Sequence, residues 1–350
     1  MAPTGTIIVT GANGGIGSAI VSQIFASPEL ALYHGIYTVR DPTASPLPVP
    51  AKHTHEYETL PLDLNDLAGI REIAATINKK VADGEIPPIR ALILNAGYQE
   101  LDTQRFTKDG FATVFTANYL GHWLLVLLLL QSMDRERGRV VVLGSKAHEQ
   151  RHPTSPFLKQ NARPFADEKW KTILDDSTDP VAKGTWSTHK EDPSWMSGIR
   201  RYSAAKLCSV MMIAELQRRL DTDPQLNKLS ILGVDPGTVP TKLARHSPWF
   251  IRVLMFQVIF PFVAALQEWR NPHSNNDIRT PAKSARDILA AAFESNPVLG
   301  EHPKGLYLDG SERSDVSAEA QDPKKREMVW KDSVRYTQLR EGETVLANWQ

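Results

Sequence analysis

The chain has 350 residues, of which 41% are hydrophobic and 23% charged, the usage of an ordinary globular protein that can bury a substantial core. Forty basic residues balance forty acidic ones, so the chain lacks the basic excess typical of nucleic-acid-binding proteins. The single cysteine, Cys208, excludes a disulfide scaffold and a cysteine-rich zinc site, and it fits a reducing compartment.

Short apolar stretches alternate with helix-like stretches along most of the chain, as in a parallel sheet with crossover helices. In chain order, the expected strands are residues 6–9, 35–39, 57–62, 91–94, 139–143, 229–234 and 305–308. The expected helices are residues 16–25, 67–81, 110–133, 202–220 and 281–293. The sequence therefore predicts an α/β fold with a doubly wound parallel sheet of the Rossmann type, built as one domain over residues 1–350.

Two regions interrupt this alternation. Residues 146–201 contain five prolines and three tryptophans and are too long for an ordinary connection between a strand and a helix. We expect an insertion there, which is either a solvated surface excursion or a segment whose tryptophans cover the substrate or pack on the protein. Residues 311–350 form a charged C-terminal extension with helical character around residues 324–339.

Two apolar segments raise the question of membrane contact. Residues 110–133 carry no formal charge, but Asn118 and His122 interrupt them, and the fully apolar part is too short to cross about 30 Å of hydrocarbon. A buried or subunit-interface helix is expected instead. Residues 253–267 are broken by Pro261 and fit a substrate lid or a shallow membrane contact. The N-terminus lacks a signal-peptide pattern, which favours a cytoplasmic protein with, at most, peripheral association with an intracellular membrane.

A glycine-rich run, TGANGGIG at residues 10–17, follows the first strand directly and opens the first helix. Glycines let the backbone turn sharply and approach a pyrophosphate closely, and the helix N-terminus offers N–H groups to the phosphate. This strand–turn–helix context predicts a dinucleotide site rather than a tight turn without a ligand. The spacing through Gly11, Gly15 and Gly17 differs from the most general dinucleotide fingerprint.

The end of the second strand indicates which nicotinamide coenzyme binds. An acidic residue there accepts hydrogen bonds from the ribose of NAD, whereas an arginine accommodates the 2′-phosphate of NADP. The sequence reads Arg40-Asp41 at this point. The planar guanidinium of Arg40 suits a phosphate, so NADP(H) is the predicted cofactor, and Asp41 keeps NAD(H) open as the alternative.

Tyr202 and Lys206 are four residues apart on an expected helix and therefore share one face. A nearby ammonium lowers the pKa of a phenol, which general acid–base catalysis requires. The pair alone is common on surface helices, but other polar residues are expected near it. Ser145 follows a buried strand, and Asn118 lies inside an uncharged helix where a buried amide needs a partner. Asn95-Ala96-Gly97 and the run from Asp235 to Thr241 end further strands at the same carboxyl edge.

These residues resemble the short-chain dehydrogenase/reductase family, and the resemblance spans most of the chain. The order of the motifs matches the family, as do the spacings of 23 residues from Asn95 to Asn118 and 27 from Asn118 to Ser145. The resemblance implies that Tyr202 exchanges a proton with the substrate oxygen, that Ser145 holds this oxygen, and that Lys206 lowers the pKa of Tyr202 and contacts the nicotinamide ribose. Asn118 would anchor a water that relays protons. The implied cofactor-binding residues are Gly11, Asn13, Gly15, Ile16, Gly17, Arg40, Asp63, Leu64, Asn95, Ala96, Gly97, Tyr202, Lys206, Pro236, Gly237, Val239 and Thr241.

Within the family, the sequence around Asn118 and the helical tail are similar to the retinol dehydrogenase and lipophilic-ketone reductase subgroup. Residues 242–280 stand where the family places its substrate loop and are rich in aromatic and aliphatic side chains, so we expect an apolar lid. The predicted activity interconverts a bulky lipophilic or aromatic ketone and its secondary alcohol, in specialised metabolism or in sterol- or retinoid-like metabolism. The expected partners are this small substrate and a second copy of the chain, which would form a homodimer through residues 120–130.

Two departures from the family are plain. The 56 residues between Ser145 and Tyr202 replace a family connection of about a dozen, and Asp235 stands before Pro-Gly where the family commonly has Asn or His. Two alternative functions remain open: a cofactor-binding regulator without turnover, and a non-redox epimerase, dehydratase or cyclase on the same fold. The histidines lack carboxylate or cysteine partners at metal-ligand spacing, so no metal site is predicted.

Overall fold

An eight-stranded sheet forms the centre of the protein, with the strand order β3-β2-β1-β4-β5-β6-β7-β8. The computed structural model describes residues 3–43, 47, 49–50, 53–149, 163–240, 260–271 and 275–350. All neighbouring strands are parallel except the last pair. The strands are β1 (Thr6–Thr10), β2 (His34–Val39), β3 (Tyr57–Pro61), β4 (Ile89–Leu94), β5 (Arg139–Leu143), β6 (Ser230–Asp235), β7 (Tyr307–Asp309) and β8 (Glu312–Arg313).

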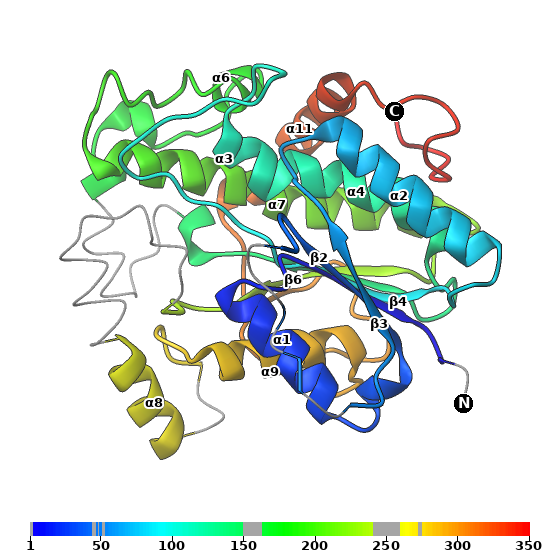
Figure 1. The fold of residues 1–350 in the computed structure, drawn as a ribbon. Helices are drawn as coiled ribbons and strands as arrows, with labels where there is room; N and C mark the ends of the chain where they lie inside the picture. Colours follow the sequence, from blue (N-terminus) through cyan, green and yellow to red (C-terminus); the bar gives the residue numbers. More distant parts are fainter. Residues whose placement is uncertain are drawn as a thin grey trace.

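Helices cover both faces of this sheet (Figure 1). One face carries α1 (Gly15–Ala26) and α9 (Pro281–Phe293), and the other carries α2 (Leu67–Ala82), α4 (Gly121–Leu129) and α7 (Trp195–Thr222). The central strands β1, β4, β5 and β6 are buried along their whole length, because helices cover both of their sides. The strand order reverses direction between β1 and β4, which places the ligand crevice beyond the carboxyl ends of these strands.

All expected strands and helices are present, and the doubly wound α/β fold is confirmed. The helix expected over residues 110–133 begins only at α3 (Thr113–Phe115) and passes through a π-helical turn, Thr116–Leu120, before α4. Strand β8 was not expected, because its two exposed charged residues carry no hydrophobic pattern. Helix α7 begins at Trp195, seven residues earlier than expected, since the Ser194 hydroxyl accepts a hydrogen bond from Met196 N and caps it. The insertion before α7 is therefore residues 146–194.

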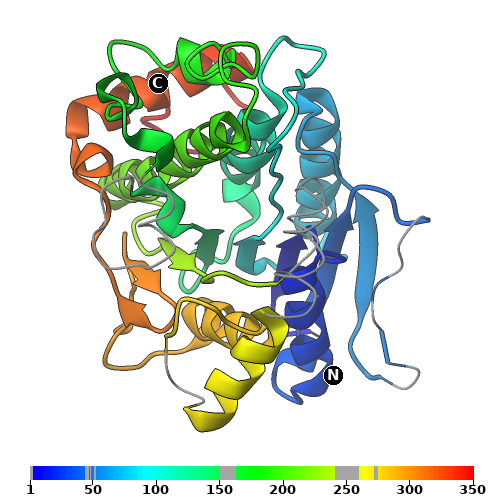
Figure 2. The same ribbon diagram turned by 90° about the vertical axis from the view of Figure 1, so that its left-hand side faces the viewer.

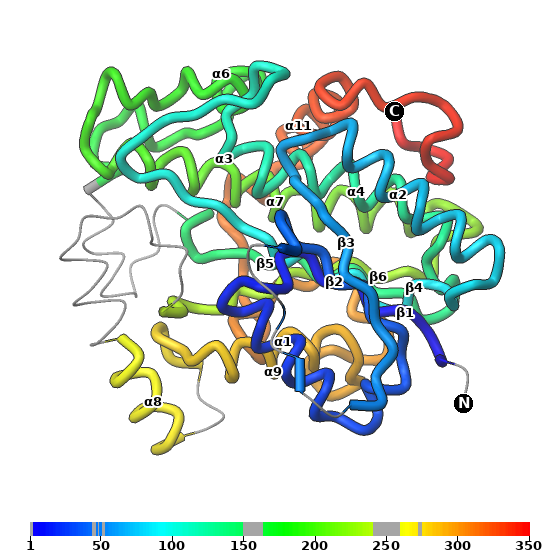
Figure 3. Tube along the Cα trace, viewed as in Figure 1, coloured from blue at the N-terminus to red at the C-terminus, as the bar shows by residue number. Residues whose placement is uncertain are grey.

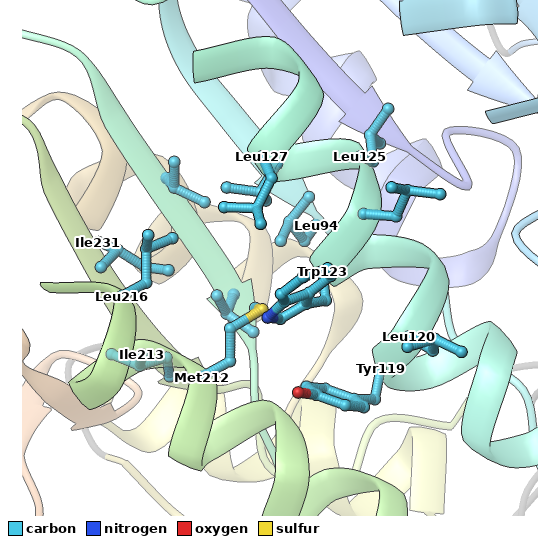
Figure 4. Packing of buried hydrophobic residues seen from close by; sticks show 14 of the residues in the cluster. Leu94, Tyr119, Leu120, Trp123, Leu125, Leu127, Met212, Ile213, Leu216 and Ile231 are labelled. Carbon is cyan, nitrogen blue, oxygen red and sulfur yellow. The ribbon is translucent and has the colours of Figure 1, made fainter. Parts of the chain in front are cut away.

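Residues 120–130 lie inside the protein and do not form a free surface. All of these residues are buried, and their side chains are 0–6% exposed. Figure 4 shows Trp123 and Leu127 packed near Leu94 of β4 and Met212 of α7, and Leu125 belongs to the same buried cluster. The segment Thr113–Ser132 is long and apolar enough for a membrane span, but nearly all of it is buried in the fold. The expectation that it provides a dimer contact is wrong, because its own chain covers it; the homodimer itself stays a prediction.

The cover over α4 and α7 comes from the C-terminal extension, which contains α10 (Ala318–Gln321) and α11 (Pro323–Thr337). The Trp330 ring meets Trp123 edge to face at 5.1 Å, and Tyr119 Oη and Ser333 Oγ share a hydrogen bond of 2.7 Å. The indole N–H of Trp330 donates to the carbonyl of Trp349. Figure 3 shows the end of the chain on the α2–α11 side of the molecule, away from α1 and α9. The extension is thus a fourth layer of the fold.

The described part of the insertion packs against the body of the protein. It contains the short helix α6 (Asp179–Ala182), and its Trp170 is buried beneath the guanidinium of Arg200, 4.3 Å from the ring. Trp186 meets Trp170 edge to face and packs on the main core. The tryptophans of residues 163–194 therefore have a packing role, and a merely solvated excursion is excluded for these residues.

The described part of the predicted lid consists of α8 (Phe260–Arg270) and residues 271 and 275–280. Helix α8 lies at the edge of the molecule near α9 (Figure 2). Phe262, Leu266 and Trp269 follow one stripe along it and are 70%, 43% and 80% exposed. The remaining apolar residues of the predicted lid, residues 242–259, lie outside the described residues.

Candidate active site

A cleft of about 550 Å³ opens at the carboxyl ends of β1, β4 and β5. Fourteen of the seventeen predicted cofactor-binding residues line it: Gly11, Asn13, Gly15, Ile16, Gly17, Arg40, Asp63, Leu64, Asn95, Ala96, Gly97, Tyr202, Lys206 and Pro236. A cleft of this size at the switch point of a doubly wound sheet fits a dinucleotide.

The glycine-rich turn forms the floor of the cleft. Gly11 has a φ of +64°, and its carbonyl accepts a hydrogen bond from Gly14 N at 3.0 Å. A Cβ at Gly17 would lie 2.2 Å from the Gly11 carbonyl oxygen, so the turn closes only with glycine at this position. The Asn95 amide donates to the carbonyls of Thr10 (2.8 Å) and Gly11 (3.1 Å) and braces the turn from β4. Helix α1 starts at Gly15 without a side-chain cap, which leaves its first N–H groups for a phosphate.

Arg40 and Asp41 both line the cleft at the end of β2 but differ in their contacts. Asp41 Oδ1 accepts hydrogen bonds from Thr43 N (2.8 Å) and Thr43 Oγ1 (2.7 Å). The Asp41 carboxylate is thereby engaged in a turn of its own chain. Arg40 is exposed on the same rim, where its guanidinium can reach a phosphate group.

Tyr202 and Lys206 lie on α7 at the inner end of the cleft. Lys206 Nζ is 5.8 Å from the centre of the Tyr202 ring and donates to the Leu143 carbonyl at 2.8 Å. Burial lowers the pKa of Lys206 to about 8, and the carboxylate of Asp235 opposes this shift. Burial raises the pKa of Tyr202. The lowering of the Tyr202 pKa by the Lys206 ammonium stays a prediction.

Ser145 lies directly beyond β5, at the start of the insertion. Its side chain lies near the Tyr202 hydroxyl and partly offsets the effect of burial on the pKa of Tyr202. Ser145 Oγ also accepts from Ala147 N at 3.2 Å. The structure thus brings the predicted Ser145, Tyr202 and Lys206 to one region at the end of β5 and the face of α7.

Asn118 is buried in the π-helical turn next to the cleft. Its Nδ2 donates to the carbonyls of Tyr98 and Val114, each at 2.7 Å, and its Oδ1 accepts from Tyr98 N at 3.1 Å. Single π-helical turns are frequent at functional sites. Here the side chain of Asn118 fixes the loop that carries Tyr98 into the cleft; the water relay stays a prediction.

The unexpected acid before Pro-Gly, Asp235, is 2% exposed beneath the catalytic residues. Burial raises its pKa, while Gly237 N donates to its Oδ1 at 2.8 Å. The Arg279 guanidinium donates to the Asp235 carbonyl (3.0 Å) and to Asp309 (2.5 Å). Lys146, next to the catalytic serine, pairs with Asp277 and Asp309 at 2.8 and 2.9 Å. This network joins the described end of the lid to β6, β7 and the serine.

Not all predicted residues line the cleft. Gly237 and Val239 do not, because Gly237 (φ +74°) turns the chain away and Thr238 pairs with Ile278. Asn118 and Ser145 lie beside the cleft and are not among its lining residues. Thr241 lies outside the described residues. Some residues that line the cleft were not predicted, although they follow or adjoin the predicted motifs. Their position next to the strand ends was the available signal. These lining residues are Leu62, Asn65, Tyr98, Ala117 and Leu143.

The fold and site together define an α/β oxidoreductase with a dinucleotide cleft and a serine–tyrosine–lysine centre. A family model described as short chain dehydrogenase matches residues 5–157. The short-chain dehydrogenase iccH of Talaromyces variabilis is 46% identical, with 99% of each chain covered. The chain belongs to the short-chain dehydrogenase/reductase family.

Two further comparisons concern one more relative and one solved structure. Human retinol dehydrogenase 13 is 28% identical over 96% of this chain and 86% of its own length, in line with the predicted retinol dehydrogenase-like subgroup. The NADPH-bound carbonyl reductase from chicken fatty liver superposes with a TM-score of 0.54 at 16% identity, covering 90% of this chain and 95% of that one. At this identity, the likeness shows the fold alone.

Proposed function

We propose that the protein is an NADP(H)-dependent oxidoreductase that interconverts a bulky lipophilic or aromatic ketone and its secondary alcohol. The observation that carries this proposal is the position of Tyr202 and Lys206 on one face of α7 in the wall of a dinucleotide-sized cleft, with Ser145 beside Tyr202. When bound, a nicotinamide coenzyme supplies the hydride exchange with the carbon atom of the substrate.

The side chains of this site supply the proton and the orientation. Burial raises the pKa of Tyr202, so the phenol is protonated at neutral pH and ready to give its proton to a carbonyl oxygen. Ser145 Oγ, which lies near that phenol, can hold the same oxygen. Lys206 projects from the same face of α7 and places a cation at the cleft wall.

Coenzyme and substrate preferences are supported by different observations. Arg40 on the rim of the cleft and the engagement of Asp41 with Thr43 support NADP(H) over NAD(H). The apolar composition of residues 247–266 and the exposed apolar stripe of α8 support a lipophilic substrate. The iccH and retinol dehydrogenase 13 relatives support oxidoreductase chemistry of this family.

The test is NADPH oxidation, followed at 340 nm, with a panel of bulky ketones. We expect Tyr202→Phe to lower kcat on the order of 1,000-fold, because the proton donor is removed, while NADPH binding measured by fluorescence is retained. Tyr119→Phe is the matched control, since it removes a buried hydroxyl bonded to Ser333 and away from the cleft. Equal activity of Tyr202→Phe and wild type would reject the acid role. Tight NADPH binding without turnover of any ketone would favour a non-catalytic or non-redox function.

A further inference from the structure

Two side chains outside the predicted site form hydrogen bonds with the main-chain N–H and carbonyl groups of Ser145. Its N–H donates to Tyr307 Oη at 3.0 Å, and its carbonyl oxygen lies 2.6 Å from Nδ1 of His148. Because a carbonyl oxygen only accepts, the imidazole proton lies on Nδ1. Neither Tyr307 nor His148 lines the cleft, so their contacts act on the serine and not on the bound molecules.

Tyr307 reaches Ser145 because two glycines make room for its ring. Tyr307 pairs with Gly233 in the register of β6 and β7, and a Cβ at Gly233 would lie 2.6 Å from its Cδ2. A Cβ at Gly144 would lie 2.2 Å from the phenolic oxygen. Any side chain at either glycine would displace the phenol from Ser145 N. The ring is therefore locked across the ends of β5 and β6, which makes its oxygen a fixed acceptor.

His148 is held from the opposite side by the C-terminal extension. The imidazole is 2% exposed and meets the Tyr307 ring at 5.1 Å with an interplanar angle of 67°. Its Nε2 accepts from the main-chain N–H of Ser317 at 3.3 Å. Ser317 in turn caps α10 through its hydroxyl, which accepts from Ala320 N at 3.2 Å. This N–H donor requires an unprotonated Nε2, so it selects the tautomer that donates to Ser145.

We propose that Tyr307 and His148 are positioning residues for Ser145. The N–H of Ser317 fixes the His148 tautomer in which Nδ1 donates to the Ser145 carbonyl. The inference rests on the proposed function, because Ser145 is taken there as the group that holds the reacting oxygen. A connection of 49 residues separates Ser145 from α7. The start of so long a connection needs packed neighbours to fix its position. Small misplacements of a catalytic group reduce turnover strongly.

The imidazole allows a test with two isosteres. In His148→Asn, the amide nitrogen takes the place of Nδ1 and retains the donor to the Ser145 carbonyl. In His148→Gln, the amide reaches the position of Nε2 and loses that donor. We expect kcat for ketone reduction to fall about 10-fold or more in His148→Gln and in Tyr307→Phe, and by less than about 3-fold in His148→Asn. The dissociation constant of NADPH should stay within about 2-fold of wild type in all three variants, because none of these residues lines the cleft.

The matched control is Tyr336→Phe, which removes a hydroxyl bonded to Asp179 in the outer layer of the fold. It should lower stability without lowering kcat. Equal kcat losses in His148→Asn and His148→Gln, or an unchanged kcat in Tyr307→Phe, would overturn the proposal.

A second readout does not depend on turnover. Hydrogen–deuterium exchange of the peptide covering residues 143–149 should be about 10-fold faster in Tyr307→Phe than in wild type, since Ser145 N–H loses its acceptor, and unchanged in Tyr336→Phe. Unchanged exchange in Tyr307→Phe would overturn the positioning role even if ketones are reduced. Faster exchange together with no turnover by wild type would reject the proposed function and keep the structural contact.

Discussion

The two ends of the active-site cleft are constructed differently. At the nucleotide end, residues 10–17 are held mainly by main-chain bonds, from Gly14 N to Gly11 O within the turn and from Ala12 N to Thr38 O on β2, with the Asn95 amide and the Ala96 N–H as nearby braces. At the serine end, Ser145 depends on Tyr307, 162 residues away, and on His148, which is itself bonded to Ser317, 169 residues away. Backbone shape therefore builds the first end and distant side chains build the second. A change at the first end should affect coenzyme binding, and a change at the second should affect turnover.

We expect the largest effect of a substitution at the nucleotide end. Gly17→Ala places a methyl group 2.2 Å from the Gly11 carbonyl oxygen and 2.8 Å from Asn95 Nδ2, so the turn must open. We expect NADPH affinity, measured by fluorescence titration, to weaken about 100-fold, or about 2.7 kcal/mol. Gly69→Ala on α2 is the matched control, because its new methyl group meets only the movable end of Asp66. NADPH binding of Gly17→Ala at wild-type strength would contradict the backbone account.

Lys206, at the inner end of the cleft, makes the stability of the protein depend on pH. Burial lowers its pKa in the folded protein from 10.5 to about 8, so between these values the unfolded chain binds more protons and stability from this group rises with pH. Lys206→Met removes the buried charge. The free energy of unfolding of the wild type, measured with urea, should therefore rise by about 2 kcal/mol between pH 7 and pH 9.5 because of this group, and this rise should be absent in Lys206→Met. A stability difference that does not change with pH would show that Lys206 is not desolvated as the structure indicates.

The smallest effect is expected at the outer rim of the nucleotide end. Arg40→Gln keeps most of the side-chain length but removes the charge. NADPH should bind about 10-fold more weakly, whereas NADH binding in the same variant is the internal control and should stay unchanged. Equal weakening for both coenzymes would show that Arg40 supports the fold of the rim and does not select the 2′-phosphate.

The sequence was informative where the relevant contacts are local. The alternation of buried strands and helices predicts the doubly wound sheet, since each element must bury its own apolar face. The glycine turn, Asn95–Gly97 and the Tyr202–Lys206 pair all follow strand ends or one helix face, so most of them meet in the cleft as predicted. The same logic left two alternatives open for residues 120–130, because an apolar helix has the same pattern whether a second subunit or its own chain covers it; the structure shows that its own chain does.

What the sequence by itself determined is the fold, the family and the identity of the chemical groups, because these depend on periodicity and on motifs a few residues long. Only the tertiary structure decided the pKa directions of Tyr202 and Lys206, since burial depends on every neighbour in space. It also decided the packing role of the described insertion, the cover of α4 and α7 by the C-terminal extension, and the grip of Tyr307 and His148 on Ser145. These contacts join segments remote in sequence, and no local pattern specifies which of them meet.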